Sequence, residues 1–330
     1  MDREPPFDRG RRGPGPRRQR HPGRAPAVGR DAGGPAGGPP APRPPAAPTS
    51  WDNVASWYDR LVGDEGSDYH RQVILPAALR MLAPEPHERV LDLCCGQGVF
   101  CRLLAQHGVD KVVGVDASGE LIAAARQRGP SGVRYLVADA TRLGPDVADG
   151  SFDAAACLMA VQDVDDLDGL FGSLGRALRP GGRAVIIMMH PCFRIPRQSS
   201  WGWDDEKGTQ YRRLDRYAGA MTIPIATHPG GPGGPGGGTS GAGGAAGGTD
   251  GSGGAAGAGG SGGAGGQYTQ FFHRPLAEYL SALGRASLAV VAAEELLTHR
   301  QSEPGGHSRG ENRAKAEFPI FLALKAVRLG

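Results

Sequence analysis

The sequence predicts a doubly wound α/β fold, and three segments between Arg89 and Asp139 carry that prediction. Each contains the continuous apolar run that is typical of a parallel strand covered on both faces. The first run ends in a glycine loop, and each of the next two ends in an aspartate. Ligands of open parallel sheets collect at the carboxyl ends of the strands, so the same order predicts where the binding site lies.

The glycine loop is the segment Cys94–Gly98, which connects the strand containing Val90, Leu91 and Leu93 to a helix expected over Val99–His107. Its two glycines let the backbone approach a ligand closely. The helix behind them presents unpaired N–H groups and a partial positive charge. This arrangement suits either a carboxylate or a phosphate of the ligand.

Asp116 ends the second strand, and Asp139 ends the third. A carboxylate at the first of these positions can accept paired hydrogen bonds from a ribose diol, and one at the second can accept from an exocyclic amine. A nicotinamide or flavin dinucleotide is one alternative ligand. The pattern G-x-G-x-x-G requires a third glycine, however, and the chain has Cys101 at that position.

These segments resemble the class I methyltransferases that bind S-adenosylmethionine, of the methyltransferase type 11 family. The similarity continues in SFDAAACLMAVQDVDD (Ser151–Asp166), which resembles the family's fourth strand, and in LGRALRPGGRAVIIMM (Leu174–Met189), which resembles its helix, Pro-Gly-Gly turn and fifth strand. It covers residues 51–228 and 267–328. The resemblance implies a Rossmann-like, seven-stranded, mostly parallel sheet with an antiparallel last strand, helices on both faces and a lid of helices and loops.

The resemblance also implies a set of residues for the cofactor S-adenosylmethionine. The loop would hold the methionine moiety, Asp116 the ribose, and Asp139 the region of the adenine. The chain departs from the family at Cys94, where a glycine is common, so this turn must accommodate a Cβ. The expected cofactor residues are Asp92, Cys94, Cys95, Gly96, Gln97, Gly98, Asp116, Ala117, Ser118, Asp139, Ala140 and Leu158.

Two segments of low complexity divide the chain. Residues 1–49 hold ten Arg and four acidic residues, which leaves a net charge of −3 on residues 50–330. This Pro/Gly/Arg-rich tail has almost no large apolar side chains, and we expect it to be disordered, although a basic arm for RNA or an acidic partner is an alternative. It lacks the apolar core of a signal peptide.

The second segment, residues 230–266, contains 22 glycines in 37 residues and should behave as a flexible linker. The sequence after it supplies only one helix and two strands, too little for an independent core. We therefore expect a single methyltransferase domain over residues 50–328 that this insertion interrupts.

Composition restricts the location and the acceptor. No apolar run approaches the ~20 residues of a membrane span, and the five cysteines form no C-x-x-C pair, which favours reduced thiols, a cytoplasmic location and no metal site. The acidic foldable part disfavours nucleic acid as a partner. No Asn/Asp-Pro-Pro-Tyr turn follows the fourth strand, as it often does in enzymes that methylate base nitrogens. The sequence therefore predicts methyl transfer to O, N or C of a small molecule, by in-line displacement in a lidded pocket.

The candidate catalytic residues are His190, which ends the fifth strand, and His273, which precedes the next helix. Either could abstract a proton at neutral pH. For His190 the alternative is a hydrogen-bonded residue that positions a turn. Arg194 or Arg274 could bind an acidic group of the substrate, or lie at the surface.

A substrate lid is expected from Trp51–Leu82 and His190–Gln270, the second of which is rich in aromatic residues. Packing of the domain or lid is the alternative role for Trp57, Trp201 and Trp203. The candidate lid residues are Trp57, Tyr58, Tyr69, His70, Gln162, Phe193, Arg194, Trp201, Trp203, Tyr211 and Arg274.

Two other functions stay open at this point. A regulator that binds S-adenosylmethionine, or a catalytically inactive paralogue, would use the same pocket. An RNA cytosine-C5 methyltransferase would use a cysteine near the end of the fifth strand, where Cys192 lies, but it would also need a Pro-Cys at the fourth strand, and Cys157 lacks that proline.

Overall fold

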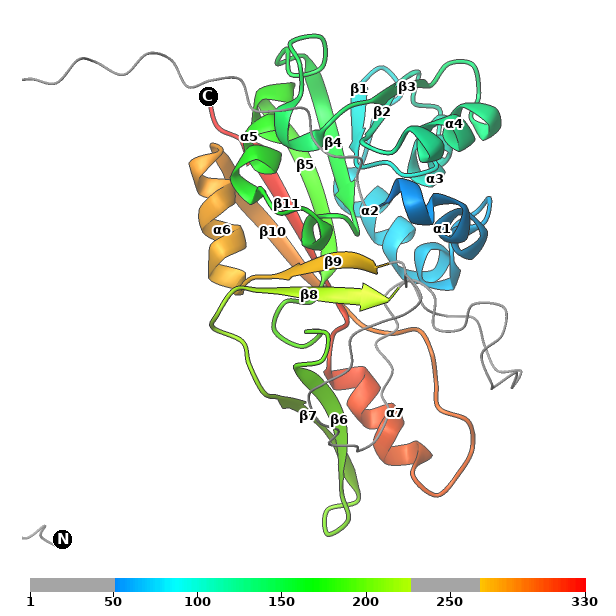
Figure 1. Ribbon diagram of the computed structural model, residues 1–330, viewed down its shortest axis with the longest axis vertical. Coiled ribbons are helices and arrows are strands. Elements are labelled where there is room, and N and C mark those ends of the chain that lie inside the picture. The colour runs from blue at the N-terminus through cyan, green and yellow to red at the C-terminus, as the bar shows by residue number, and fades with distance from the viewer. Residues whose placement is uncertain (1–50, 227–267) are drawn as a thin grey trace, which may run out of the picture. The chain divides into compact units, whose positions relative to one another are not determined.

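A computed structural model describes residues 51–226 and 268–330 (Figure 1), which lie in one compact unit spanning residues 46–330. The predictions of disorder for residues 1–49 and 230–266, and the part of the predicted lid from 227 to 267, fall outside the described residues. Within the described ranges, no helix has the length and apolarity needed to cross a membrane.

The core of the fold is a seven-stranded sheet in the order β10-β11-β5-β4-β1-β2-β3. The last strand of the chain, β11, runs antiparallel to both of its neighbours, and the other neighbouring strands pair in parallel. The predicted sheet, with its antiparallel last strand, is confirmed. Its strands are β1 (Arg89–Leu93), β2 (Lys111–Asp116), β3 (Arg134–Val137), β4 (Phe152–Leu158), β5 (Leu178–Met189), β10 (Leu288–Leu296) and β11 (Phe321–Arg328).

Helices cover both faces of this sheet, and successive strand residues alternate between them (Figure 1). In β1, Val90 packs toward one face, whereas Leu91 and Leu93 pack toward the other, and all three are fully buried. This burial on both sides explains why the strand sequence is apolar without interruption. One face is covered by α2 (Leu75–Leu82), α3 (Val99–Gln106) and α4 (Gly119–Arg128), and the other by α5 (Leu167–Ala177) and α6 (Leu276–Arg285).

Short helices precede the first strand of the sheet and follow two of the others. The chain begins its described part with η1 (Asp52–Val54) and α1 (Ala55–Val62), and a π-helical turn, η2 (His70–Ile74), leads into α2. The two helices expected over Trp51–Leu82 are therefore present, with an extra turn at each. Two single 3-10 turns, η3 (Ala140–Arg142) and η4 (Val161–Asp163), follow β3 and β4 at the carboxyl edge of the sheet.

Two small antiparallel pairs and a helix extend from this domain. Strands β6 (Ser199–Asp204) and β7 (Thr209–Leu214) form a hairpin that packs on α7 (Ser308–Glu317), as Figure 1 shows at the lower end of the molecule. Strand β8 (Met221–Ala226) pairs with β9 (Tyr268–His273). The sequence did not predict α7 or these strand pairs.

Candidate functional site

The loop between β1 and α3 holds three residues in the left-handed backbone conformation. The φ angles are +60° at Cys94, +54° at Gly96 and +80° at Gly98. A Cβ added to Gly98 would lie 2.8 Å from the hydroxyl oxygen of Tyr135, so both the conformation and the space require glycine there. Cys94 accommodates its Cβ in this conformation, as the sequence required. No side chain caps the start of α3, so its first N–H groups remain available to a ligand.

Asp116 fixes this loop to the end of β2. Its Oδ2 accepts a hydrogen bond from the N–H of Gly96 at 2.8 Å, and its Oδ1 accepts from the N–H of Ser118 at 2.9 Å. Each carboxylate oxygen has a second lone pair, so both can still accept from a diol. Burial raises the pKa of Asp116 despite these two bonds. Ser118 is itself buried and caps α4 by accepting from Leu121.

Asp92 lies beneath the loop, inside β1. It is 2% exposed and accepts a hydrogen bond from the thiol of Cys101 at 3.2 Å. Burial, with a further contribution from the charge of Asp116, raises its pKa to about 7. Burial likewise raises the pKa of Cys95 to about 11, so this thiol stays protonated at neutral pH. Within the described ranges, no basic side chain forms an ion pair with Asp92 or Asp116. Two largely buried carboxyl groups without a basic partner favour a cationic ligand.

Asp139 begins η3 after β3. Its Oδ1 accepts from the N–H of Thr141 at 2.9 Å and from the hydroxyl of the same residue at 2.8 Å. The neighbouring Ala140 is buried, and Leu158 at the end of β4 is partly buried. All twelve expected cofactor residues thus lie within strands β1, β2 and β4 or on the turns after β1, β2 and β3, although four of their carboxylate oxygens already accept hydrogen bonds from the protein.

Tyr58 from α1 covers the glycine loop. A Cβ added to Gly96 would meet its Cε1 at 3.5 Å. Burial, followed by the charges of Asp116 and Asp163, raises the pKa of Tyr58. The hydroxyl therefore stays protonated and can donate a hydrogen bond across the loop. Trp57, its neighbour on α1, is partly buried.

A set of polar contacts attaches α1 to the rest of the domain. The guanidinium of Arg128 on α4 donates to Asp59 Oδ2 at 2.7 Å and to Gln97 Oε1 at 3.2 Å. Gln97, which is 1% exposed, donates in turn from Nε2 to the carbonyl of Gly63 at 2.5 Å. These contacts link Gln97 to α1 and α4, and its expected contact with the cofactor stays a prediction.

We expect the substitution Arg128→Met to weaken binding of S-adenosylmethionine about tenfold, because α1 and Tyr58 would lose their attachment to α4. A tenfold change corresponds to roughly 1.4 kcal/mol, within the range of a partly buried charged hydrogen bond. Calorimetric titration measures the affinity. Arg80→Met is the matched control, since Arg80 forms an exposed pair with Glu294 far from the loop. Equal losses in both variants would contradict this role of Arg128.

Tyr69 and His70 contact the segment before α2 and the end of the sheet, rather than the glycine loop. The Tyr69 hydroxyl lies 2.9 Å from Thr298 Oγ1, and its ring packs edge-on against His299 and Phe321. His70 Nδ1 lies 2.7 Å from Ser67 Oγ, and burial lowers the pKa of this histidine to about 4. These contacts hold the segment before α2 against the end of the sheet.

The turn η4 presents two polar side chains after β4. Gln162 is 5% exposed, and its Nε2 donates to the carbonyl of Met159 at 2.6 Å and to Asp163 Oδ2 at 3.3 Å. Gln162 Oε1 is buried and has no hydrogen-bond partner within the described ranges. Burial raises the pKa of Asp163 to about 8. Sequence reasoning included Gln162 as a lid residue and omitted Asp163 from the site.

The two candidate catalytic histidines are both bound to the protein. His190 is 1% exposed; its Nδ1 accepts from the N–H of Cys192 at 3.2 Å, and its Nε2 donates to Glu295 Oε1 at 2.9 Å. His273 Nε2 donates to the carbonyl of Tyr217 at 2.7 Å. Burial lowers the pKa of each. For His190 the geometry supports the alternative role of positioning a turn, because neither nitrogen is left for an acceptor.

Arg274 is also engaged. It is 6% exposed and donates to the carbonyls of Val164 and Asp165 at 3.0 and 2.5 Å. Its guanidinium therefore holds the turn between η4 and α5 and is not free to bind an acidic substrate group. Arg194 lies on the turn after β5, where its N–H donates to the carbonyl of His190 at 2.8 Å.

The aromatic residues of the predicted lid pack the β6–β7 hairpin. Phe193 and Trp201 contact the ring of Phe318 edge-on, at 5.8 and 5.5 Å between centroids. Trp203 stacks on His307 at 4.1 Å. Tyr211 lies over Gly202 and is 47% exposed. These contacts support the packing role that the sequence left open for the two tryptophans.

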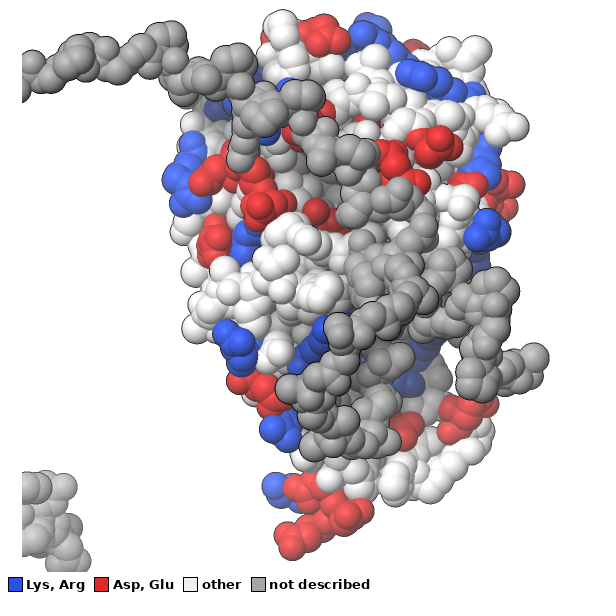
Figure 2. Space-filling model, viewed as in Figure 1, with Lys and Arg blue, Asp and Glu red and all other residues white. Residues whose placement is uncertain are grey.

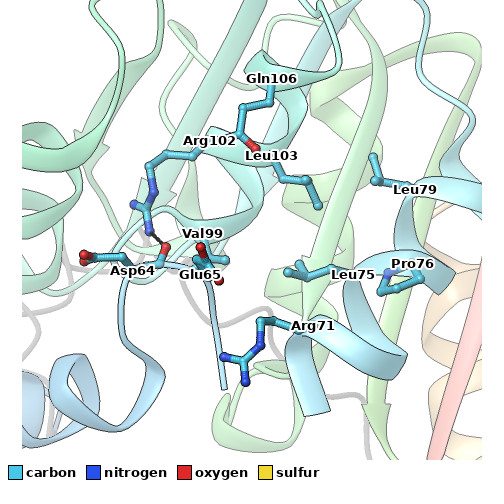
Figure 3. A pocket seen from close by; sticks show the side chains of 10 residues that line it. All are labelled: Asp64, Glu65, Arg71, Leu75, Pro76, Leu79, Val99, Arg102, Leu103 and Gln106. Atoms are coloured by element: carbon cyan, nitrogen blue, oxygen red, sulfur yellow. Dashed lines mark hydrogen bonds between the residues drawn. The ribbon is translucent and has the colours of Figure 1, made fainter. Parts of the chain in front are cut away.

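A hollow of about 430 Å³ lies between α3 and the segment formed by η2 and α2 (Figure 3). Leucines form much of its wall, and Arg71 and Arg102 lie at its edge with Asp64 and Glu65. None of the twelve expected cofactor residues lines it. It is therefore separate from the candidate site.

Residues 91–186 match the family described as "Methyltransferase domain". A 2-phytyl-1,4-naphtoquinone methyltransferase of Nostoc punctiforme is 30% identical over 188 residues, which are 54% of this chain and 74% of that protein. The chain belongs to the class I methyltransferases that depend on S-adenosylmethionine.

Other methyltransferases show a similar degree of identity over a shorter part. A 2-phytyl-1,4-naphtoquinone methyltransferase of Synechococcus elongatus is 36% identical over 152 residues, which are 44% of this chain and 65% of that relative. For a demethylmenaquinone methyltransferase of Beutenbergia cavernae the identity is 38% over 153 residues, 46% of this chain and 62% of that relative. The chain thus matches somewhat less than two thirds of the length of these two relatives.

Solved structures agree with the fold of this class I methyltransferase. An S-adenosylmethionine dependent methyltransferase from Mesorhizobium loti is 29% identical with a TM-score of 0.52, and the match covers 77% of this chain and 96% of that one. A Haloferax volcanii methyltransferase in complex with the Trm112 activator is 16% identical with a TM-score of 0.54, covering 86% and 98%, and shows the same fold.

The residues of this methyltransferase fit the cofactor of its family, S-adenosylmethionine. The loop keeps its glycine conformations, Asp116 retains acceptor capacity for a diol, and Gln162 Oε1 is a buried acceptor that has no partner among the residues the structure describes. S-adenosylmethionine carries a sulfonium and an ammonium group, and the raised pKa values of Asp92 and Asp163 are those of carboxyl groups that a nearby cation would ionise.

The cysteines of this methyltransferase do not favour the RNA cytosine-C5 alternative. Cys157 is fully buried inside β4, and the thiol of Cys192 donates to the Tyr217 hydroxyl at 3.6 Å. On the face drawn in Figure 2, acidic and basic side chains alternate, and the described residues form no continuous basic stripe.

Proposed function

We propose that this protein transfers a methyl group from S-adenosylmethionine to O, N or C of a small-molecule acceptor, by in-line displacement beneath the cap formed by α1. S-adenosylmethionine supplies an activated methyl group on a positively charged sulfur. The protein residues position the reactants and exclude water, which are the main requirements of such a displacement.

One observation carries this proposal: Asp116 holds Gly96 in place while both of its oxygens keep acceptor capacity. The loop is thereby preorganised for a ribose and a methionine moiety before the ligand arrives. The arrangement of Gly96 and Gly98 beneath Tyr58 supports the same ligand.

The acceptor class is a finer proposal. Relatives with 36% and 38% identity are named as methyltransferases of quinone compounds, which makes hydroxylated aromatic rings the first compounds to test. We place the protein in the cytoplasm on the basis of its five free cysteines, because such thiols persist in a reducing compartment.

The experiment is a calorimetric titration of the full chain with S-adenosylmethionine and S-adenosylhomocysteine, followed by transfer of a labelled methyl group to phenols, reduced naphthoquinones, amines and carboxylic acids. We expect both ligands to bind and at least one acceptor class to be methylated. Binding without transfer to any class would favour the regulator or inactive paralogue. No binding of either ligand would contradict the proposed function altogether.

A further inference from the structure

Asp163 differs from Asp116 and Asp139 because, among the described residues, no backbone N–H donates to its carboxylate. It lies on η4, directly after the central strand β4, at the carboxyl edge of the sheet. Among the described residues, its carboxylate accepts one hydrogen bond, the long contact from Gln162 Nε2 at 3.3 Å. It forms no ion pair within the described ranges, although carboxylates in such settings are normally paired.

The position of Asp163 relative to the cofactor loop follows from Tyr58. The hydroxyl of Tyr58, which covers Gly96, is close enough to both Asp116 and Asp163 for their charges to raise its pKa. Asp116 ends β2 and Asp163 follows β4, and these two strands lie on either side of β1 in the sheet. The Asp163 side chain is only partly buried, so a ligand bound at this edge of the sheet can contact it.

Titratable groups approach Asp163 from several elements. Tyr58 comes from α1, and Tyr279 comes from α6, where Asp163 contributes to the raised pKa of its phenol. At the end of β9, His273 and Arg274 are occupied by backbone carbonyls, those of Tyr217 and of the turn after η4, respectively. The end of β5 contributes buried methionines. No basic side chain on these elements forms an ion pair with Asp163.

We propose that Asp163 is the catalytic base of this site and accepts the proton of a methyl acceptor that is weakly acidic, such as a phenol or hydroquinone. The inference rests on the proposed function. It also replaces the two histidines as candidates for the base, since His190 uses both of its nitrogens and His273 bonds a carbonyl.

The proton of the acceptor moves to a carboxylate oxygen of Asp163. The electron pair that it leaves behind forms the bond to the methyl carbon, and the pair of the broken carbon–sulfur bond stays on sulfur, which becomes a neutral thioether. The proton on Asp163 then exchanges with solvent.

The protonation of Asp163 matches this role. Its pKa of about 8 keeps most of the side chain neutral in the free protein at pH 7. A nearby positive charge lowers the pKa of a carboxyl group, so a sulfonium in the pocket would convert it to the carboxylate. A base that titrates close to the working pH is the most effective kind.

Proton release on binding tests this proposal without any acceptor. S-adenosylmethionine and S-adenosylhomocysteine both carry the ammonium and carboxylate groups, and they differ in the charge on sulfur. Titrations at pH 7 in two buffers of different ionisation enthalpy measure the protons released. We expect the wild type to release about half a proton more with S-adenosylmethionine than with S-adenosylhomocysteine.

The variant Asp163→Asn should lose this difference while binding both ligands within about threefold of the wild type. Asp165→Asn is the matched control, because that carboxylate lies two residues further along and is 85% exposed. A difference that persists in Asp163→Asn would overturn the proposal, as would loss of binding for both ligands in that variant. Failure of the wild type to bind either ligand would instead contradict the proposed function.

With a methylated acceptor in hand, kcat of Asp163→Asn should fall about a hundredfold, in line with the loss of a general base. The rise of kcat/KM with pH that reports the base should disappear, and Asp163→Glu should restore part of it. A structural role would lower the rate without changing the shape of the pH profile, and that outcome would overturn the proposal.

Discussion

Replacing Asp116 with alanine is expected to weaken the affinity for S-adenosylmethionine by about a hundredfold or more. The carboxylate is the acceptor for the Gly96 and Ser118 N–H groups and the proposed partner of the ribose diol. Hydrogen bonds to a charged group contribute about 1.5–3 kcal/mol each. The variant loses hydrogen bonds to the ligand and also the order of the loop. We therefore expect the loss of binding free energy to equal at least that of two such hydrogen bonds. Calorimetric titration of S-adenosylmethionine measures the change.

The control for this variant is Asp110→Ala, since Asp110 lies exposed at the opposite end of the same strand. It should bind with wild-type affinity. Asp116→Asn retains the size of the side chain and one acceptor oxygen, so we expect an intermediate affinity. Wild-type affinity in Asp116→Ala would refute the assigned site.

The variant Arg183→Met is expected to lose about 3 kcal/mol of unfolding free energy at pH 7. Arg183 on β5 forms a bidentate pair with Glu88, with both distances at 2.7 Å, and also donates to the carbonyls of Leu82 and Ala83. The Glu88 side chain is only 9% exposed. Removing one partner of a buried pair costs roughly 3–5 kcal/mol, because it leaves the other charge without compensation.

The pH dependence of this pair has a definite sign. The hydrogen bond from Arg183 lowers the pKa of Glu88 below its usual 4.5. The pair therefore stabilises the protein above pH 4.5, and this stabilisation is lost as the pH falls through the lowered pKa. Denaturant unfolding at pH 7 and pH 4 should therefore show a smaller difference between variant and wild type at the lower pH. The double variant Arg183→Met/Glu88→Gln should recover part of the stability. No recovery would show that the loss comes from packing.

The cofactor site could be predicted from the sequence where a short segment determines its own geometry. The left-handed angles of Gly96 and Gly98, and the placement of Asp116 at the end of a buried strand, follow from local sequence and from the rule that sites gather at carboxyl ends of strands. The base could not be found in this way. Asp163 has no local motif, and its environment comes from helices at both ends of the chain.

The contacts of His190 could not be predicted for the same physical reason. His190 ends a strand, as a base in such a fold could, but its partner Glu295 lies 105 residues later and becomes its neighbour only through β11. Helix α7 was missed because it is strongly polar and buries only Gly310 and Ala314, so it has no apolar periodicity to detect.

The ladder of β8 and β9 brings the two ends of their connection close together. Ala226 and Tyr268 are opposite each other in the last pair of this ladder, with Cα atoms that ladder geometry places about 5 Å apart. A tight turn of about two residues would already close the connection, and any sequence whose ends can meet at that separation would serve as well. A reporter domain whose ends lie close together can therefore be inserted between these two strands.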